Sequence, residues 1–250
     1  MANDVYVKYL PLVDSTNRYV RDEAAALWSE AAGRSCVAVY AGMQTAGRGQ
    51  RGNVWSSDQG KNLLLSILVR PGTALEVSNQ FVLSQAVALS VHAALERHGI
   101  DTRLKWPNDI YVGNRKLAGI LIELDYYGTH VEQAIIGIGL NINQDGFPPM
   151  DRVPVSMKML QGKEYAVDDV LADVLGCFCG YYTAMLHGDG EIASEYGRLL
   201  FGIGEEHRFV DAGGFFDAVI EGVEPTGHLK LRRKDGTLSR YAFKEVELLL

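Results

Sequence analysis

The chain changes character near Leu200, and this change constrains its fold more than any other feature of the sequence. Beyond it, short strand-like runs alternate with glycine- and proline-containing turns. These runs are Phe209-Val210, Phe216–Val223, Leu229–Arg233 and Tyr241–Phe243. Short strands joined by tight turns indicate a small β-barrel. We therefore expect two domains, covering residues 1–200 and 201–250.

Before this boundary, helices alternate irregularly with strands. Helices are predicted over residues 18–32, 78–98, 167–187 and 191–200. Strands are predicted over residues 36–44, 62–70, 102–106, 110–112, 116–124 and 134–142. The Gly113-Asn114 pair between two of these strands is typical of a hairpin turn. This order favours an α+β fold, with a mixed, mostly antiparallel sheet flanked by helices, over repeated βαβ units.

Composition narrows the class of protein. Lys+Arg number 24 against Asp+Glu 31, giving a net charge of -7, so the chain lacks the cationic field that sequence-independent DNA binding requires. Its cysteines, Cys36, Cys177 and Cys179, form neither a disulfide framework nor a zinc motif. The sequence shows no signal peptide and no run of eighteen apolar residues. We expect a cytoplasmic protein that binds neither DNA nor a membrane.

A glycine-rich segment spans residues 47–54 and matches the pattern G-x-G-x-x-G. Trp55 and three polar residues follow it, instead of the helix that a dinucleotide-binding loop requires. The H-R-D and D-F-G motifs of protein kinases are also missing from the sequence. What remains is a loop whose backbone N–H groups and arginines, Arg48 and Arg51, can bind phosphate or carboxylate. The alternative is a solvated surface turn.

The segment Lys105-Trp106-Pro107-Asn108-Asp109 places a cation, an amide and a carboxylate within five residues. Lys105 could neutralise a phosphate, while Asn108 and Asp109 could order a hydrated magnesium ion or handle a proton. The alternative is an ordinary turn with Asn-Asp chemistry.

Two strand segments carry unusual residues. Lys116 begins an otherwise apolar strand, and a solvated lysine is the alternative to a functional one. Gly137 and Gly139 lie inside another strand, where glycine marks a bulge or the close approach of a ligand or backbone. Taken together, the polar segments indicate a small molecule that bears phosphate or carboxylate.

In combination, these segments resemble the biotin protein ligase family. The matching segments follow the family's order and are Asp14-Ser15-Thr16-Asn17, Gln44–Gly49, Arg51-Gly52, Trp55, Lys105–Asp109, Arg115–Leu121 and Gly137–Asn143. The resemblance implies a class II synthetase-like catalytic domain and an SH3-like C-terminal barrel. It also implies an Mg²⁺- and ATP-dependent ligase that activates biotin as biotinyl-5'-AMP. The biotinyl group then passes to a lysine of a biotin carboxyl carrier protein or domain of the acetyl-CoA carboxylase type.

The resemblance implies roles for individual residues as well. Lys116, Arg48 and Asp109 are the expected catalytic residues: Lys116 contacts the biotin carboxylate and the α-phosphate, and Asp109 accepts the proton of the incoming lysine. The residues expected to contact biotin are Ser15, Thr16, Asn17, Gln44, Gly47, Arg48, Gly49, Gln50, Lys116, Gly119 and Gly139. Those expected to contact ATP or the adenylate are Arg48, Arg51, Trp55, Lys105, Asn108, Lys116 and Asn141. Asn108 is also the candidate magnesium ligand.

Two departures from the family pattern lead to further expectations. Gln50 and Asn53 stand where arginine or lysine is common, so we expect weaker retention of the adenylate and more release of free biotinyl-AMP. Only thirteen residues precede Asp14, too few for the DNA-binding domain of some members, so we expect the monofunctional type. A homodimer paired through sheet edges is compatible with the family. A lipoate ligase or octanoyltransferase and a non-catalytic biotin-binding module are the alternatives.

Overall fold

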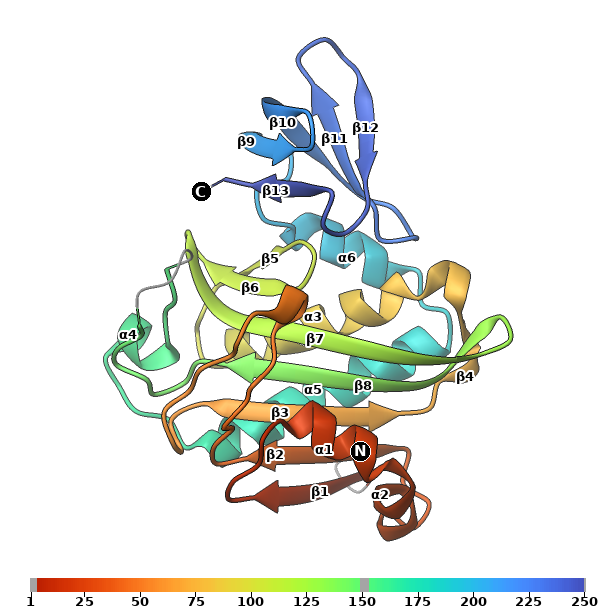
Figure 1. The fold of residues 1–250 in the computed structure, drawn as a ribbon, viewed down its shortest axis with the longest axis vertical. Coiled ribbons are helices and arrows are strands. Elements are labelled where there is room, and N and C mark those ends of the chain that lie inside the picture. The colour runs from red at the N-terminus through yellow and green to blue at the C-terminus, as the bar shows by residue number, and fades with distance from the viewer. Residues whose placement is uncertain (1–3, 149–152, 250) are drawn as a thin grey trace.

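The computed structural model describes residues 4–148 and 153–249, without the side chain of Arg51. Its centre is an eight-stranded sheet in the order β1-β2-β3-β8-β7-β6-β5, with β4 paired to β8 (Figure 1). The strands are β1 (Val5–Leu10), β2 (Cys36–Ala41), β3 (Leu63–Val69), β4 (Gly72–Glu76), β5 (Arg103–Lys105), β6 (Asp109–Val112), β7 (Arg115–Tyr127) and β8 (His130–Leu140). β1 and β2 pair in parallel, and the other pairs described are antiparallel.

Helices cover both faces of this sheet. One face carries α3 (Phe81–Arg97), α5 (Val167–Leu186) and α6 (Glu191–Leu199), and the other carries α1 (Thr16–Asp22) and α2 (Ala24–Glu30) (Figure 1). Because side chains alternate along a strand, β3 is buried on both sides: Ile67 packs toward α3 and α5, and Leu68 packs with α1 and α2. The short helix α4 (Met157–Gln161) lies beyond the sheet, and 3-10 turns occupy Gln50–Gly52 and Val77–Asn79.

α5 is long and apolar enough, by length and composition alone, to cross a membrane. In the structure it packs against α3 and α6, and its buried side chains belong to the main hydrophobic core. Core packing therefore accounts for its composition, as expected for a buried helix of a globular domain.

The hairpin of β6 and β7 contains a bulge. Ile110 pairs with Ala118 but Tyr111 pairs with Lys116, so Leu117 is the extra residue of β7. An extra residue re-aims the side chains that precede it. Accordingly, the Lys116 ammonium lies 3.1 Å from the position that a Cβ would take on Gly119.

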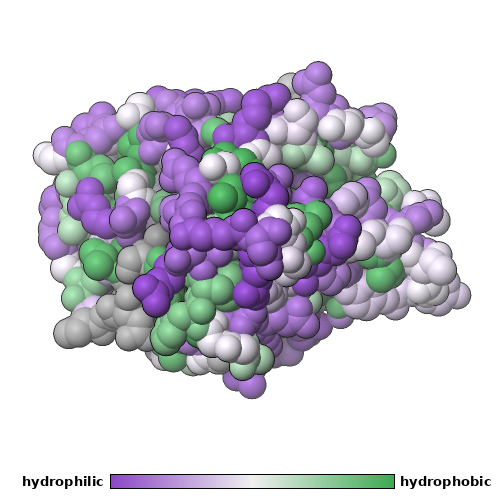
Figure 2. Space-filling model, turned by 90° about the horizontal axis from the view of Figure 1, so that it is seen from above, coloured by the Kyte–Doolittle hydropathy of each residue, from purple (hydrophilic) through white to green (hydrophobic). Residues whose placement is uncertain are grey.

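A separate antiparallel sheet lies at the C-terminal end, in the order β12-β11-β10-β9-β13. Its strands are β9 (Glu206–Asp211), β10 (Gly214–Val223), β11 (Leu229–Arg233), β12 (Leu238–Tyr241) and β13 (Val246–Leu248). Phe216 stacks between Phe209 and Tyr241 at its centre, at 5.7 and 5.9 Å between ring centroids. This small barrel sits above α6 and the β5–β6 hairpin (Figure 1). Small apolar patches alternate with hydrophilic residues on this end of the molecule (Figure 2).

These features confirm the expected fold class. The expected helix over residues 18–32 is instead two helices, because the backbone bends at Glu23 and lets both pack on the sheet. The strand expected at 36–44 ends at Ala41, and the one expected at 241–243 is wrong: β12 ends at Tyr241, and Ala242 donates its N–H to Glu245 in a turn. β1, β4, α4 and β13 were not predicted. We propose the domain boundary near residue 200, between α6 and β9.

Candidate active site

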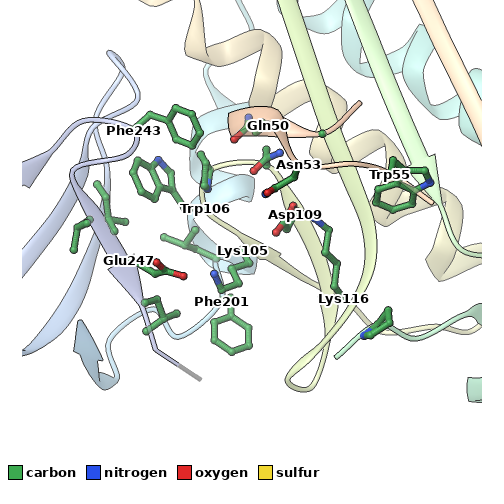
Figure 3. Close-up of a pocket in the computed structure, with 18 of the residues that line it drawn as sticks. Gln50, Asn53, Trp55, Lys105, Trp106, Asp109, Lys116, Phe201, Phe243 and Glu247 are labelled. Atoms are coloured by element: carbon green, nitrogen blue, oxygen red, sulfur yellow. Dashed lines mark ion pairs between the residues drawn. The ribbon is translucent and has the colours of Figure 1, made fainter. Parts of the chain in front are cut away.

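Two cavities meet at the end of the main sheet. The larger, here called the barrel cavity, has a volume of about 600 Å³ and lies between the Lys105–Asp109 segment and the barrel (Figure 3). The smaller, here called the sheet slot, has about 50 Å³ and lies between the start of α1, the glycine loop and β7 and β8. The residues that line both cavities are Gly49, Gln50, Trp55, Asn108 and Lys116. Every one of them was predicted from the sequence to be a site residue.

A lysine and a carboxylate form an ion pair at this junction. Lys116 Nζ lies 2.6 Å from Asp109 Oδ1, with the Lys116 side chain 24% and the Asp109 side chain 3% exposed. The pairing of Asp109 with Gly119 in the β6–β7 hairpin brings the two together. Lys116 Nζ also lies 5.7 Å from the centre of the Trp55 ring. A partly exposed cation fixed by a buried carboxylate can stabilise negative charge that develops in the adjacent cavity.

The indole of Trp55 fills most of the sheet slot. A Cβ on Gly139 would lie 2.4 Å from Trp55 Cε2, and one on Gly119 would lie 3.1 Å from Trp55 Cζ3. The two predicted glycines therefore allow a flat ring to lie directly on the backbone of β7 and β8. Trp55 Nε1 is buried without a hydrogen-bond partner. A slot of about 50 Å³ is far below the roughly 300–1,000 Å³ of ligand pockets, so a ligand requires the indole to move.

Buried and half-buried polar groups form the end of the slot beside α1. Gln44 Oε1 accepts hydrogen bonds from Thr16 N at 2.7 Å and from Thr16 Oγ1 at 3.1 Å. Ser66 Oγ lies 2.8 Å from Thr16 Oγ1 and donates to Asn17 Oδ1 at 2.6 Å, while Asn17 Nδ2 donates to Glu123 at 2.9 Å. Ser15, likewise predicted, is buried and lines the slot. Ser66 was not predicted, although it is the one hydroxyl in the apolar run of β3.

The glycine loop is an ordered, compact turn. Gly49 N donates to Asn53 O at 2.7 Å, and Trp55 N donates to Gly47 O at 3.0 Å. Arg48, with its side chain 52% exposed, forms an ion pair with Glu123 of β7 at 3.4 Å. The predicted site residue Arg51 has its side chain outside the described part of the structure.

Lys105 and Asn108, both expected from the sequence to contact ATP or the adenylate, line the barrel cavity. Asn108 Nδ2 donates to Ile120 O at 2.6 Å, so the amide nitrogen faces β7 and the amide oxygen points away from Ile120 O. Within residues 4–148 and 153–249, no group of three or more His, Cys, Asp or Glu side chains could hold a metal ion. Since magnesium prefers oxygen ligands and binds through substrate phosphates, Asn108 and Asp109 fit an ion that a nucleotide brings with it.

Asn141 lines the barrel cavity but also has a structural role. It is 3% exposed, and its Nδ2 donates to Val155 O at 3.1 Å. Gln144, which sequence reasoning missed, is similarly buried: its Oε1 accepts from Asn62 Nδ2 at 2.6 Å and from Asp58 N at 3.2 Å. After β8, the Gln144 amide therefore anchors the segment that follows Trp55, while Asn141 holds the chain at Val155.

Across the barrel cavity, the barrel is joined to the predicted site segment. Trp106 Nε1 donates to Gly227 O at 2.9 Å, and its ring meets Phe243 edge-on with centroids 6.3 Å apart (Figure 3). The barrel thus forms one wall of the larger cavity.

Comparisons with known proteins agree with this architecture. The profile of the Biotin/lipoate A/B protein ligase family matches residues 9–141. The bifunctional ligase/repressor BirA of Bacillus spizizenii is 34% identical over 214 residues, which cover 84% of this chain and 65% of that protein. A biotin–[acetyl-CoA-carboxylase] ligase of Paracoccus denitrificans is 32% identical over 209 residues, covering 79% of this chain and 85% of that protein.

Among solved structures, a biotin protein ligase from Aquifex aeolicus in complex with biotin and ATP superposes with a TM-score of 0.80 and 27% identity, over 98% of both chains. The mixed sheet with its appended barrel is therefore the architecture of a biotin protein ligase. The chain belongs to the biotin/lipoate A/B protein ligase family. It spans 65% of the length of the Bacillus spizizenii relative.

Proposed function

We propose that the protein activates biotin with ATP and attaches it to a lysine of a biotin carboxyl carrier protein or domain. In the first step, a biotin carboxylate oxygen bonds to the α-phosphorus while the bond to pyrophosphate breaks. In the second, the lysine amine bonds to the acyl carbon, loses a proton, and AMP leaves. The observation that carries this proposal is the Lys116–Asp109 ion pair at the junction of the two cavities.

The sheet slot is the proposed site of biotin. Its buried amides and hydroxyls offer hydrogen bonds to a small polar ring system, and Gly119 and Gly139 leave a flat gap once Trp55 moves. The biotin-contacting residues proposed are those predicted: Ser15, Thr16, Asn17, Gln44, Gly47, Arg48, Gly49, Gln50, Lys116, Gly119 and Gly139. The slot opens toward Lys116, so a carboxylate at the end of the biotin chain would meet the ammonium there.

The barrel cavity is the proposed site of ATP and of the incoming lysine. Lys105, Asn108 and Lys116 line it and provide cations and an amide for the triphosphate. Trp55 borders both cavities, and its ring is proposed to form a wall against the adenine of the nucleotide. Asp109, which lies beside Lys116, is the proposed acceptor of the proton of the amine. Magnesium, when bound with the nucleotide, would lower the repulsion between phosphates and the attacking carboxylate.

An acceptor of the acetyl-CoA carboxylase type is proposed because the Paracoccus denitrificans relative is a biotin–[acetyl-CoA-carboxylase] ligase. The lack of DNA binding is proposed from the net charge of -7, and a cytoplasmic location and a homodimer paired through sheet edges are proposed from the resemblance to the family. Gln50 and Asn53 both line the barrel cavity, the proposed nucleotide site. We propose that these uncharged side chains, standing where arginine or lysine is common, weaken the retention of the adenylate.

Biotin-dependent ATP–pyrophosphate exchange tests the proposal. We expect exchange with biotin and none with lipoate or octanoate, and we expect Lys116→Ala to abolish it. Exchange with lipoate or octanoate alone would move the substrate to a neighbouring branch of the family. Biotin binding without exchange would identify a non-catalytic binding module and refute the proposed reaction.

A further inference from the structure

Glu123 stands at the end of the sheet slot, on the same face of β7 as the slot. Side chains of a strand alternate, so Glu123 shares a face with Gly119 and Leu121, both of which line the slot. The Glu123 side chain is only 20% exposed. A carboxylate in this position is unusual, because β7 is otherwise apolar between Leu117 and Leu124.

The two oxygens of Glu123 bind different parts of the proposed biotin site. Oε2 accepts from Asn17 Nδ2 at 2.9 Å, and Oε1 forms the 3.4 Å ion pair with Arg48 of the glycine loop. Arg21 lies farther away, at 3.8 Å, and its closer partner is Asp125 at 3.2 Å. The carboxylate therefore joins the loop to the wall of the slot.

The contact between Glu123 and Arg48 holds the glycine loop over the sheet slot, which the Trp55 indole already fills. The same nine-residue loop, 47–55, carries Arg48 at one end and Trp55 at the other, and the Trp55 N–H donates to Gly47 O at 3.0 Å. A ligand in the slot must displace the indole, and a ligand that bears a carboxylate or phosphate competes with Glu123 for the Arg48 guanidinium.

We propose that Glu123 is a positioning residue: it holds Arg48, and with it Trp55, in the closed position until a ligand takes the guanidinium, and it orients Asn17 throughout. This inference rests on the proposed function only for the identity of that ligand. Because both partners are partly exposed, the ion pair shifts the closed–open balance by about two- to fivefold.

The Glu123–Arg48 ion pair, here called the latch, can be tested by hydrogen exchange of the ligand-free protein. The backbone N–H groups of Gly49 and Trp55 should exchange about two- to fivefold faster in Glu123→Gln, whose amide oxygen still accepts from Asn17. Arg48→Gln should have the same effect, and the double variant should exceed neither single one, since both remove one interaction. Asp125→Asn, which removes a carboxylate that contacts Arg21 but not Arg48, is the matched control and should leave exchange unchanged. Unchanged exchange in Glu123→Gln and Arg48→Gln, or additive effects, would overturn the proposal.

Biotin titration then separates a latch from a merely structural role. With the competing carboxylate removed, Glu123→Gln should lower the KM for biotin about two- to fivefold at an unchanged Tm, whereas loss of structural support would raise KM. A raised KM would overturn the proposal. Lack of any biotin activity in the unaltered protein, together with faster exchange in Glu123→Gln, would refute the proposed function but leave the latch supported.

Discussion

Substitutions at the Lys116–Asp109 ion pair can remove charge from the site while nearly keeping the volume of its side chains. Replacing Lys116 with Met keeps an unbranched apolar stem but removes the ammonium 2.6 Å from a carboxylate that is only 3% exposed. Breaking a fully buried ion pair by removing one partner costs about 3–5 kcal/mol. Lys116 is 24% exposed and borders the barrel cavity, so water offsets part of this cost. We expect a loss of about 2 kcal/mol, close to the value of hydrogen bonds to charged groups.

Thermal unfolding measures this loss. For a chain of this length, about 2 kcal/mol corresponds to a fall in Tm of roughly 4–8 °C. Lys116→Met combined with Asp109→Asn should regain most of it, because a neutral amide tolerates burial better than a charge whose cation has gone. Arg115→Met is the matched control: it removes an exposed charge at the neighbouring position and should change stability by less than about 0.5 kcal/mol.

The double variant Lys116→Met/Asp109→Asn should regain stability but not enzymatic activity. Loss of the ammonium should lower biotin-dependent pyrophosphate exchange by about 10²–10³-fold in both Lys116→Met variants, as for removal of a preorganised charge-stabilising donor. A Lys116→Met protein as stable as its parent, or a double variant as unstable as the single one, would refute the reasoning about the buried carboxylate. Full exchange activity in either would refute the proposed role of Lys116.

Three further outcomes are expected. In Gly139→Ala the new methyl group would lie 2.4 Å from Trp55 Cε2, so the indole must leave the slot. The emission of Trp55 is the difference between the spectra with and without Trp55→Phe, and in the Gly139→Ala background it should lie at longer wavelength than in the parent. An unchanged wavelength would contradict the packing of Trp55 on Gly139. Burial raises the pKa of the Cys36 thiol from 9.0 to about 12, so between these pH values the unfolded chain releases a proton that the folded chain keeps. The free energy of unfolding should therefore fall by up to about 1.4 kcal/mol per pH unit above pH 9, and Cys36→Ala should flatten this decline in urea titrations; an equal slope in both proteins would exclude Cys36 as its source. Trp106→Phe removes the 2.9 Å bond to Gly227 O while keeping a ring, and the resulting loss of about 1 kcal/mol should speed amide exchange at residues 224–229 about fivefold; unchanged exchange there would mean that this bond does not stabilise the barrel's attachment.

The elements predicted well were those whose own residues carry a strong pattern. β3 is a continuous apolar run, and α3 and α5 bury an extended apolar face, so local sequence was sufficient. β1 was missed because its burial alternates weakly and its place depends on parallel pairing with β2, more than twenty-five residues away. β12 was placed too late because tight turns of a small barrel leave few residues to set the register.

The site was predicted in its parts but not in its arrangement. Resemblance brought the glycine loop, Lys116 and Asp109 together, and the structure places them around one junction. It did not indicate that Trp55 fills the slot, because that depends on the fold of the loop against β7 and β8. Glu123 had a signal in the sequence, a carboxylate within an apolar strand, but its partners lie over seventy residues away along the chain.

The bulge at Leu117 makes the length of one hairpin part of the chemistry. In a regular strand, Lys116 and Gly119, three residues apart, would point to opposite faces of the sheet. The extra residue lets both face the same space, so the number of residues in the strand directs the ammonium toward the gap at Gly119, and the ion pair with Asp109 holds it there. A one-residue insertion in β6 opposite Leu117 would keep every proposed site residue and the hairpin turn, yet turn the lysine toward the opposite side of the sheet.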